Sequence, residues 1–195
     1  TGNSGNATQG VLGTYGTLTV AADGTYTYVA NTAAAEALDA GDQVTDVFTY
    51  TVKDDDDVNS STATLTITVT GVDDDPVGNN DAGAISAGSG VLSNDTDADA
   101  SSSLTVSAIG GGGTVGQALN GTYGVLTLNS DGSYTYVANG RGEDALLADA
   151  TVTDTFTYTV SDGAGTTATA DLVITVTGVG PQAVAYTGSV NEDAT

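Results

Sequence analysis

Residues 13–31 read GTYGTLTVAADGTYTYVAN, and residues 121–139 read GTYGVLTLNSDGSYTYVAN. The agreement continues at the same offset of 108 residues, because VTDVFTYTV at 44–52 matches VTDTFTYTV at 152–160. The string ITVTGV then recurs at 67–72 and 174–179, one residue short of that offset. A period of this length suits a small domain with its own core rather than a solenoid unit. The sequence therefore predicts a string of similar domains.

The repeated segments have the alternation of β-strands. In residues 60–71 (SSTATLTITVTG) apolar side chains alternate with threonine, a period of two that predicts a half-buried strand with a hydroxylated outer face. Asp-Gly pairs at 23–24 and 131–132 predict tight hairpins. Only residues 33–38 (AAAEAL) and 142–147 (GEDALL) favour a short helical turn. Short strands separated by turn signals indicate an all-β sandwich rather than a parallel sheet.

The two copies are not equally complete. Residues 80–109 precede the glycine-rich stretch of the second copy and have no counterpart in the first. We expect an incomplete first repeat at 1–72, a complete one at 73–179, and the opening of a third at 180–195 (GPQAVAYTGSVNEDAT). The chain is then a window on a longer protein, or its tail supplies edge strands to a neighbouring copy.

Composition restricts the function. The chain has 2 basic and 25 acidic residues, a formal charge of −23, and no His or Cys. This charge excludes nucleic acid and anionic membrane surfaces as partners, because both need clustered Lys and Arg. No apolar run is long enough for membrane insertion. Without His or Cys the usual nucleophilic and general-base schemes lack their parts, so we expect no enzyme activity.

The acidic residues indicate calcium. Asp accounts for 22 of the 25 acids, and three clusters interrupt the strands: 54–57 (DDDD), 73–75 (DDD) and 95–99 (DTDAD). Alternate carboxylates in a loop can converge on a hard cation that takes 6–8 oxygen ligands. If alternate loops fall at alternate poles of a sandwich, the 73–75 linker meets Asp162 and Asp81, whereas the 95–99 loop lies at the opposite pole. The candidate calcium ligands are Asp54, Asp56, Asp73, Asp74, Asp75, Asp81, Asp95, Asp97, Asp99 and Asp162. Plain solvation is the alternative for the 95–99 loop, and the 54–57 run is either an additional site or an exposed charge cluster.

Aromatic side chains recur in register with the repeat. Ten of the eleven Tyr and Phe residues occupy paired positions in the two copies. In-strand aromatics that recur in this way favour a core role over a sugar-binding platform.

The combined pattern of GTYG, DG-YTYVAN, VTD-FTYTV and TVTGV resembles the VCBS repeat of giant bacterial surface proteins. Residues 91–106 (VLSNDTDADASSSLTV) resemble the opening of bacterial cadherin-like domains. The resemblance implies tandem immunoglobulin- or cadherin-like sandwiches of type I-secreted adhesins and biofilm proteins, with calcium at the joints. One departure is 178–183 (GVGPQA), a joint without an acid.

Three functions follow from these observations. The first is a calcium-stiffened stalk or spacer of an extracellular, cell-surface adhesin or fibre, with neighbouring repeats as its partners. The second is a filament subunit that joins other copies of itself by strand exchange between the tail and the incomplete first domain. The third is a module that binds surface polysaccharide.

Overall fold

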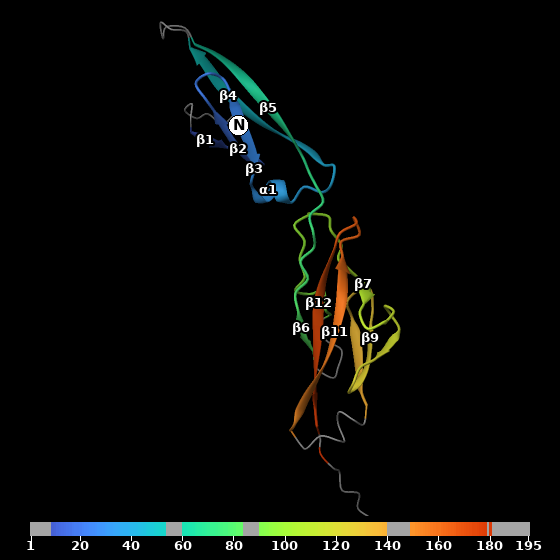
Figure 1. Ribbon diagram of the computed structural model, residues 1–195. Coiled ribbons are helices and arrows are strands. Elements are labelled where there is room, and N and C mark those ends of the chain that lie inside the picture. Colours follow the sequence, from blue (N-terminus) through green and yellow to red (C-terminus); the bar gives the residue numbers. More distant parts are fainter. Residues whose placement is uncertain (1–8, 54–59, 84–89, 140–148, 179, 181–195) are drawn as a thin grey trace, which may run out of the picture. The chain divides into compact units, whose positions relative to one another are not determined.

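The computed structural model describes residues 9–53, 60–83, 90–139, 149–178 and 180; about half of these residues are in β-strands, and the regular structure is otherwise one short helix (Figure 1). They form two compact units. Unit 1 comprises Thr1–Val77, Thr96–Leu104 and Ser161–Ala168, and unit 2 comprises Gly78–Asp95, Thr105–Val160 and Thr169–Thr195.

Unit 1 contains two antiparallel sheets. The first has the order β1 (Gly10–Leu12), β2 (Gly16–Val20) and β3 (Tyr26–Ala30). The second pairs β4 (Gln43–Lys53) with β5 (Ser60–Thr70) along all eleven residues, from Gln43 opposite Thr70 to Lys53 opposite Ser60. Tyr28 of β3 meets Phe48 of β4 edge to face, with ring centroids 6.2 Å apart, so the two sheets enclose a shared core.

Local sequence explains the connections of unit 1. Gly24 has φ +87° in the β2–β3 turn, a conformation that glycine adopts without strain, and its N–H donates to the Ala21 carbonyl. The predicted helical segment forms α1 (Ala33–Glu36), which begins after Thr32. The Thr32 hydroxyl accepts a hydrogen bond from Ala35 N at 3.2 Å, the usual role of an N-cap threonine.

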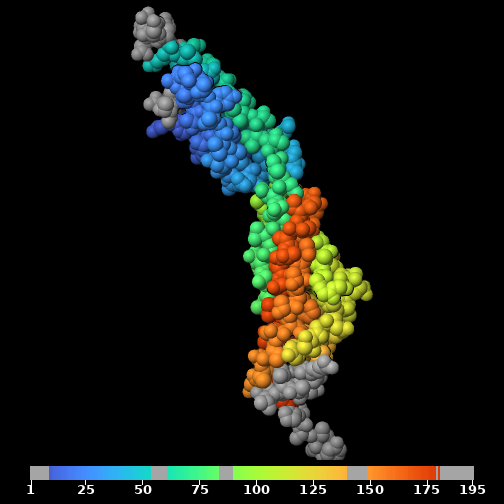
Figure 2. All heavy atoms as spheres, viewed as in Figure 1, coloured from blue at the N-terminus to red at the C-terminus, as the bar shows by residue number. Residues whose placement is uncertain are grey.

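The described residues of unit 2 form a sandwich of seven strands. One sheet has the order β10 (Tyr134–Ala138), β9 (Gly124–Leu128) and β8 (Ala118–Asn120). The other has the order β6 (Asp81–Gly83), β12 (Thr167–Thr177), β11 (Thr151–Ser161) and β7 (Thr105–Ile109), with β6 parallel to β12. Figure 2 shows the yellow-green segment that contains β7 packed against the orange strands β11 and β12. The fold class is therefore all-β, as predicted.

The period of two predicted from the sequence is confirmed in both units. Along β12, buried Ala170, Leu172, Ile174 and Val176 alternate with more exposed residues. In β5 the threonines are exposed, and Val69 is buried.

The predicted core role of the paired aromatics is confirmed at four positions of unit 2, where Tyr123 is only half-buried, and is wrong at two positions of unit 1. The unit 2 residues Tyr134, Tyr136, Phe156 and Tyr158 are all buried. Tyr26 and Tyr50, which occupy the same positions of the repeat as Tyr134 and Tyr158, are 53% and 44% exposed. In unit 2, residues of the described segments 79–83, 90–95 and 105–110 contact the strands that carry these aromatics, for example Asn79 and Val91 at the Tyr158 hydroxyl.

Three predicted features lie outside the described residues: the second helical segment at 142–147, the acidic turn that carries Asp54 and Asp56, and the tail at 181–195.

Candidate metal centre

Three acidic loops of unit 1 meet: 73–77, 96–102 and 161–166. Asp74 N donates to Asp99 Oδ2 at 2.9 Å, which joins the first two loops. Val77 and Thr96 form an antiparallel bridge, with N···O distances of 2.8 and 3.1 Å. The Thr166 hydroxyl oxygen lies 3.2 Å from the Asp74 carbonyl oxygen, which brings the third loop to the same place. Candidate ligands from distant parts of the sequence are thus held together.

The predicted position of the 95–99 loop at the opposite pole is wrong. That prediction assumed that alternate loops fall at alternate poles of the sandwich. In the structure the chain runs outward through β6 and then returns, so that Thr96 pairs with Val77. Asp97 and Asp99 therefore lie beside the 73–75 linker rather than at the opposite pole.

Asp73 lies in the field of several other carboxylates. Its pKa is raised by burial first, and then by the negative charges of Asp162, Asp99, Asp97 and Asp75. The whole sequence has only two basic residues against 25 acidic ones, so most of this charge can be balanced only by cations from solution.

Two carboxylate oxygens of the cluster lack hydrogen-bond donors. Asp97 Oδ2 and Asp99 Oδ1 are buried and have no hydrogen-bond partner among the described residues. The other oxygens of the same side chains are bonded, since Asp97 Oδ1 accepts from Asp99 N at 2.8 Å and Asp99 Oδ2 accepts from Asp74 N. A buried carboxylate oxygen without a donor is costly unless a proton or a metal ion satisfies it.

Asp162 is held by its own turn. Its Oδ1 accepts from Ala164 N at 2.8 Å and from Gly165 N at 3.2 Å, and its Oδ2 accepts from the Thr166 hydroxyl. The hydrogen bond from Thr166, aided by the backbone donors, lowers the pKa of Asp162 despite its burial. Asp162 is therefore fixed as a carboxylate next to Asp73.

Asp81 and Asp95 belong to a different cluster, in unit 2, centred on the fully buried Tyr158. The Tyr158 hydroxyl lies 2.8 Å from Asp81 Oδ2, 3.2 Å from Asp95 Oδ2 and 3.0 Å from the Val91 carbonyl oxygen. Burial raises the pKa of Asp81, although the hydrogen bond from Tyr158 opposes this shift. Asp81 therefore does not lie with the 73–75 linker, contrary to the prediction.

Sequence reasoning missed Tyr158 and Thr166 as partners of the acids. The signal for Tyr158 was weak, because its twin Tyr50 has the same neighbours in sequence. Thr166 follows Asp162 by four residues, a spacing that suits a side chain capping its own turn.

The family model of the bacterial cadherin-like domain matches the chain twice, over residues 1–71 and 72–178. The chain belongs to the bacterial cadherin-like domain family. No curated protein matches the chain. Among the solved structures that match is a cis-dimer of protocadherin gammaB7 repeats EC3–6, at 13% identity and a TM-score of 0.36. The match covers 89% of this chain and 39% of that one.

Cadherin-like domains generally bind calcium, and the donor set of this cadherin-like chain fits that ion. Calcium prefers carboxylate and carbonyl oxygens, and the loops present both, including the two oxygens without donors. In the described part of the chain, no three acidic side chains are already arranged as a finished metal site. Asp99 and Asp162 instead each accept hydrogen bonds from backbone N–H groups.

An open pocket of about 280 Å³ adjoins the cluster (all its lining residues belong to unit 1). It is lined by Asp39, Ala40, Asp73, Asp99, Ser101, Ser102, Asp162, Gly163 and Ala164. Its lining contains carboxylates and hydroxyls but no basic side chain, so a hydrated cation suits it better than an anion. A separate observation concerns membranes: none of the helices described is long and apolar enough to cross one.

Proposed function

We propose that this chain is a calcium-stabilised repeat of an extracellular stalk or spacer, acting in adhesion or in a biofilm and not as an enzyme. Its repeats would be those expected at 1–72 and 73–179, and its partners would be neighbouring repeats. Membership of the bacterial cadherin-like family supports an extracellular repeat module. The single observation that carries the calcium role is the pair of buried oxygens without donors, Asp97 Oδ2 and Asp99 Oδ1.

The chain's own residues would supply most of the site. Asp97 and Asp99 would offer their unbonded oxygens, and Asp73 and Asp75 would add charge from the linker. Asp162 is already fixed as a carboxylate by Thr166 and its turn. When bound, calcium would neutralise this repulsion and tie the three loops to one centre.

An extracellular setting suits the expected affinity. Extracellular calcium modules bind with dissociation constants of about 10⁻⁴–10⁻³ M. With free calcium at about 100 times the dissociation constant, one site would stabilise the folded state by about 2.7 kcal/mol. That is a large part of the ~5–15 kcal/mol typical of a domain.

The test compares thermal unfolding of the full chain with and without calcium, in three proteins. The wild type should gain several degrees in Tm on addition of calcium. The double variant Asp97→Asn/Asp99→Asn should lose that response. The control Asp131→Asn removes one charge from a turn in which Ser133 already satisfies the carboxylate, and should respond as the wild type does.

Two results would contradict the proposal. One is an equal calcium response in the double variant, which would place any binding elsewhere. The other is a Tm that calcium at 10 mM or more leaves unchanged, well above the expected dissociation constant of about 10⁻⁴–10⁻³ M. Small-angle scattering with and without chelator tests the stiffening separately, and an unchanged length distribution would refute it.

A further inference from the structure

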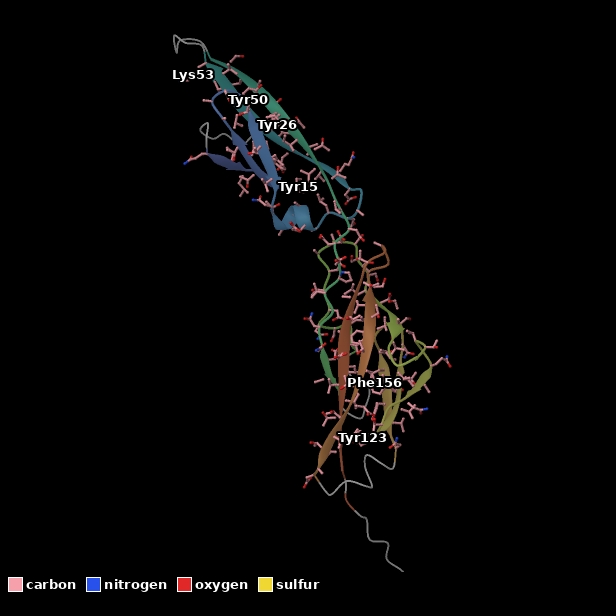
Figure 3. All side chains as sticks on the ribbon, in the orientation of Figure 1. Tyr15, Tyr26, Tyr50, Lys53, Tyr123 and Phe156 are labelled. Atoms are coloured by element: carbon pink, nitrogen blue, oxygen red, sulfur yellow. The ribbon has the colours of Figure 1, made fainter. Side chains whose placement is uncertain are left out.

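The chain enters and leaves the sheets of unit 2 through two neighbouring strands. β6 follows Gly78, the first residue of the unit, and β12 ends directly before Gly178. The two strands pair in parallel over three residue pairs, 81–83 with 172–174. Figure 1 shows green β6 beside orange-red β12, and Figure 3 labels Phe156 on β11, the next strand of the same sheet.

Parallel pairing of these strands determines how tension along the chain acts on them. Because both strands run in the same direction, tension pulls the start of β6 and the end of β12 towards opposite ends of the pair. The strands must then slide past each other, so all three residue pairs are loaded together. A pair pulled apart at one end instead breaks its hydrogen bonds one after another. The parallel pair is therefore loaded in the direction in which it resists most strongly.

Side-chain hydrogen bonds hold the first residues of the loaded segment. Asn80 Oδ1 accepts a hydrogen bond from Asp171 N at 2.9 Å, which continues the contact with β12 by one residue. The hydroxyl of Tyr158, on β11, lies 2.8 Å from Asp81 Oδ2. Tyr158 is fully buried, so water does not compete for this hydrogen bond. The residues that tension would pull first are thus bonded to both β11 and β12.

The last residue of β6 is closely packed against the core. A Cβ on Gly83 would lie 2.4 Å from the Tyr134 hydroxyl oxygen and 2.6 Å from Ile174 Cδ1. Tyr134 and Ile174 are both buried. Sliding of β6 along β12 therefore separates packed apolar surface as well as hydrogen bonds.

We propose that unit 2 bears tension along the chain through this parallel pair, with Asn80 and Tyr158 as its anchors. We call the three residue pairs and the two side-chain hydrogen bonds the tension clamp. The clamp is built from the chain's own backbone and side chains, so it acts without calcium. The inference rests on the proposed stalk role only for the source of the tension. Resistance to pulling is a property of unit 2 that is measured by itself.

The experiment pulls single molecules of the full chain by two introduced cysteines, in chelator. The natural sequence has no cysteine, so each pair of handles is unique. Val77→Cys with Thr177→Cys loads the clamp along its strands, because Thr177 is the last residue of β12. Val77→Cys with Thr169→Cys loads it across one end, since a Cβ on the neighbouring Gly78 would lie 3.3 Å from the Thr169 carbonyl oxygen. All three replaced side chains are exposed.

The unfolding force should depend on the direction of pulling. The handles at 77 and 177 should need about two to three times the force of those at 77 and 169, because three residue pairs share the load instead of yielding in turn. Asn80→Ala and Tyr158→Phe each remove one of the five contacts of the clamp. Each should therefore lower the force between 77 and 177 by about a fifth.

Gly121→Ala is the matched control. Its added Cβ would lie 2.4 Å from Asp154 Oδ2, so it strains unit 2 outside the clamp. It should lower the Tm of unit 2 and leave the force between 77 and 177 unchanged.

Two results would overturn the proposal. Equal unfolding forces in the two pulling directions would show that the parallel pair does not carry the load, and this comparison needs no core variant. A loss of force in Gly121→Ala as large as in Asn80→Ala and Tyr158→Phe would show that the force follows the overall stability of unit 2. Both results are obtained in chelator and leave the calcium proposal standing, whereas a Tm that does not respond to calcium leaves the clamp standing.

Discussion

Replacement of Asp154 by alanine tests how strongly a single buried carboxylate holds the repeat together. Asp154 Oδ1 accepts from Thr122 N at 2.9 Å, and Oδ2 accepts from Tyr123 N at 2.9 Å and from Tyr136 Oη at 2.6 Å. These bonds tie β11 to the loop before β9 and to β10. The substitution leaves all three donors without this acceptor.

The expected loss follows from these bonds. A hydrogen bond to a charged group contributes about 1.5–3 kcal/mol net, and three donors are affected. The cost of burying Asp154 in the wild type offsets part of the sum. We therefore expect Asp154→Ala to lower the free energy of unfolding of unit 2 by about 4 kcal/mol, near the upper end for single substitutions.

The first repeat supplies a matched comparison. Asp46 makes the same three bonds, to Thr14 N, Tyr15 N and Tyr28 Oη, at 2.8, 3.1 and 2.7 Å. Tyr28 is only half-buried, whereas Tyr136 is 4% exposed. Water can therefore replace part of what Asp46→Ala removes, and we expect a smaller loss of about 2 kcal/mol in unit 1.

Native-state hydrogen exchange is the suitable assay, because it reports the opening free energy of each unit separately when their melting transitions overlap. The slowest amides of β11 and β12 report unit 2, and those of β4 and β5 report unit 1. A loss below about 1 kcal/mol for Asp154→Ala, or equal losses in the two units, would refute the reasoning that burial sets the strength of these bonds.

Three further predictions follow from the same contacts. Although burial opposes it, hydrogen bonds from Tyr28 and from backbone N–H groups lower the pKa of Asp46. The unfolded chain therefore takes up this proton at a higher pH than the folded chain, and the stabilisation is present above the unfolded pKa of about 3.9 and lost as pH falls through the folded pKa. Unfolding of unit 1 measured from pH 2 to 6 should show this slope, and Asp46→Asn should reduce it. Gly121→Ala should destabilise unit 2, because a Cβ there would lie 2.4 Å from Asp154 Oδ2 and 2.8 Å from Phe156 Cζ; Gly110→Ala, whose Cβ meets nothing nearer than 3.3 Å, is the control in thermal melts. Tyr158→Phe should cost about 1–3 kcal/mol by removing a hydroxyl shared by Asp81, Asp95 and Val91, whereas Tyr50→Phe should change denaturant unfolding by less than about 0.5 kcal/mol.

Features of the fold that depend on neighbouring residues were predictable. The alternation in residues 60–70 predicts β5, because a strand with one wet face needs a polar residue at every second position. Asp23-Gly24 predicts the β2–β3 hairpin, because the turn needs a residue that tolerates positive φ. Both features depend on a few consecutive residues, which the sequence states directly.

The position of the acidic loops was not predictable in the same way. Their composition indicated a cation, but their place depended on how many times the chain crosses the sandwich between residues 75 and 95. β6 has only three residues, and among the described residues the return passage forms an isolated bridge between Val77 and Thr96 together with side-chain hydrogen bonds between Asn79 and Asn94. Segments as short as these show too little alternation to be recognised as strands from the sequence. The predicted pole of the 95–99 loop was therefore wrong.

Because the two copies have the same local sequence, the prediction of the core was wrong at two positions of unit 1. The hairpin and the β11-type strand recur in both copies, so Tyr26 and Tyr134 look equivalent although only one of them is covered. In unit 2 these positions are buried by the opening segment, which contacts the Tyr158 hydroxyl through Asn79 and Val91. That segment places Val91, 1% exposed, against the Tyr158 hydroxyl, and the loop with Asp97 and Asp99 follows it within eight residues. On the proposed function, a cation that satisfies those two carboxylates would anchor the end of the segment that closes the core. Calcium should therefore slow hydrogen exchange in β11 near Tyr158 as well as in the loops, which a site that merely screened surface charge would not do.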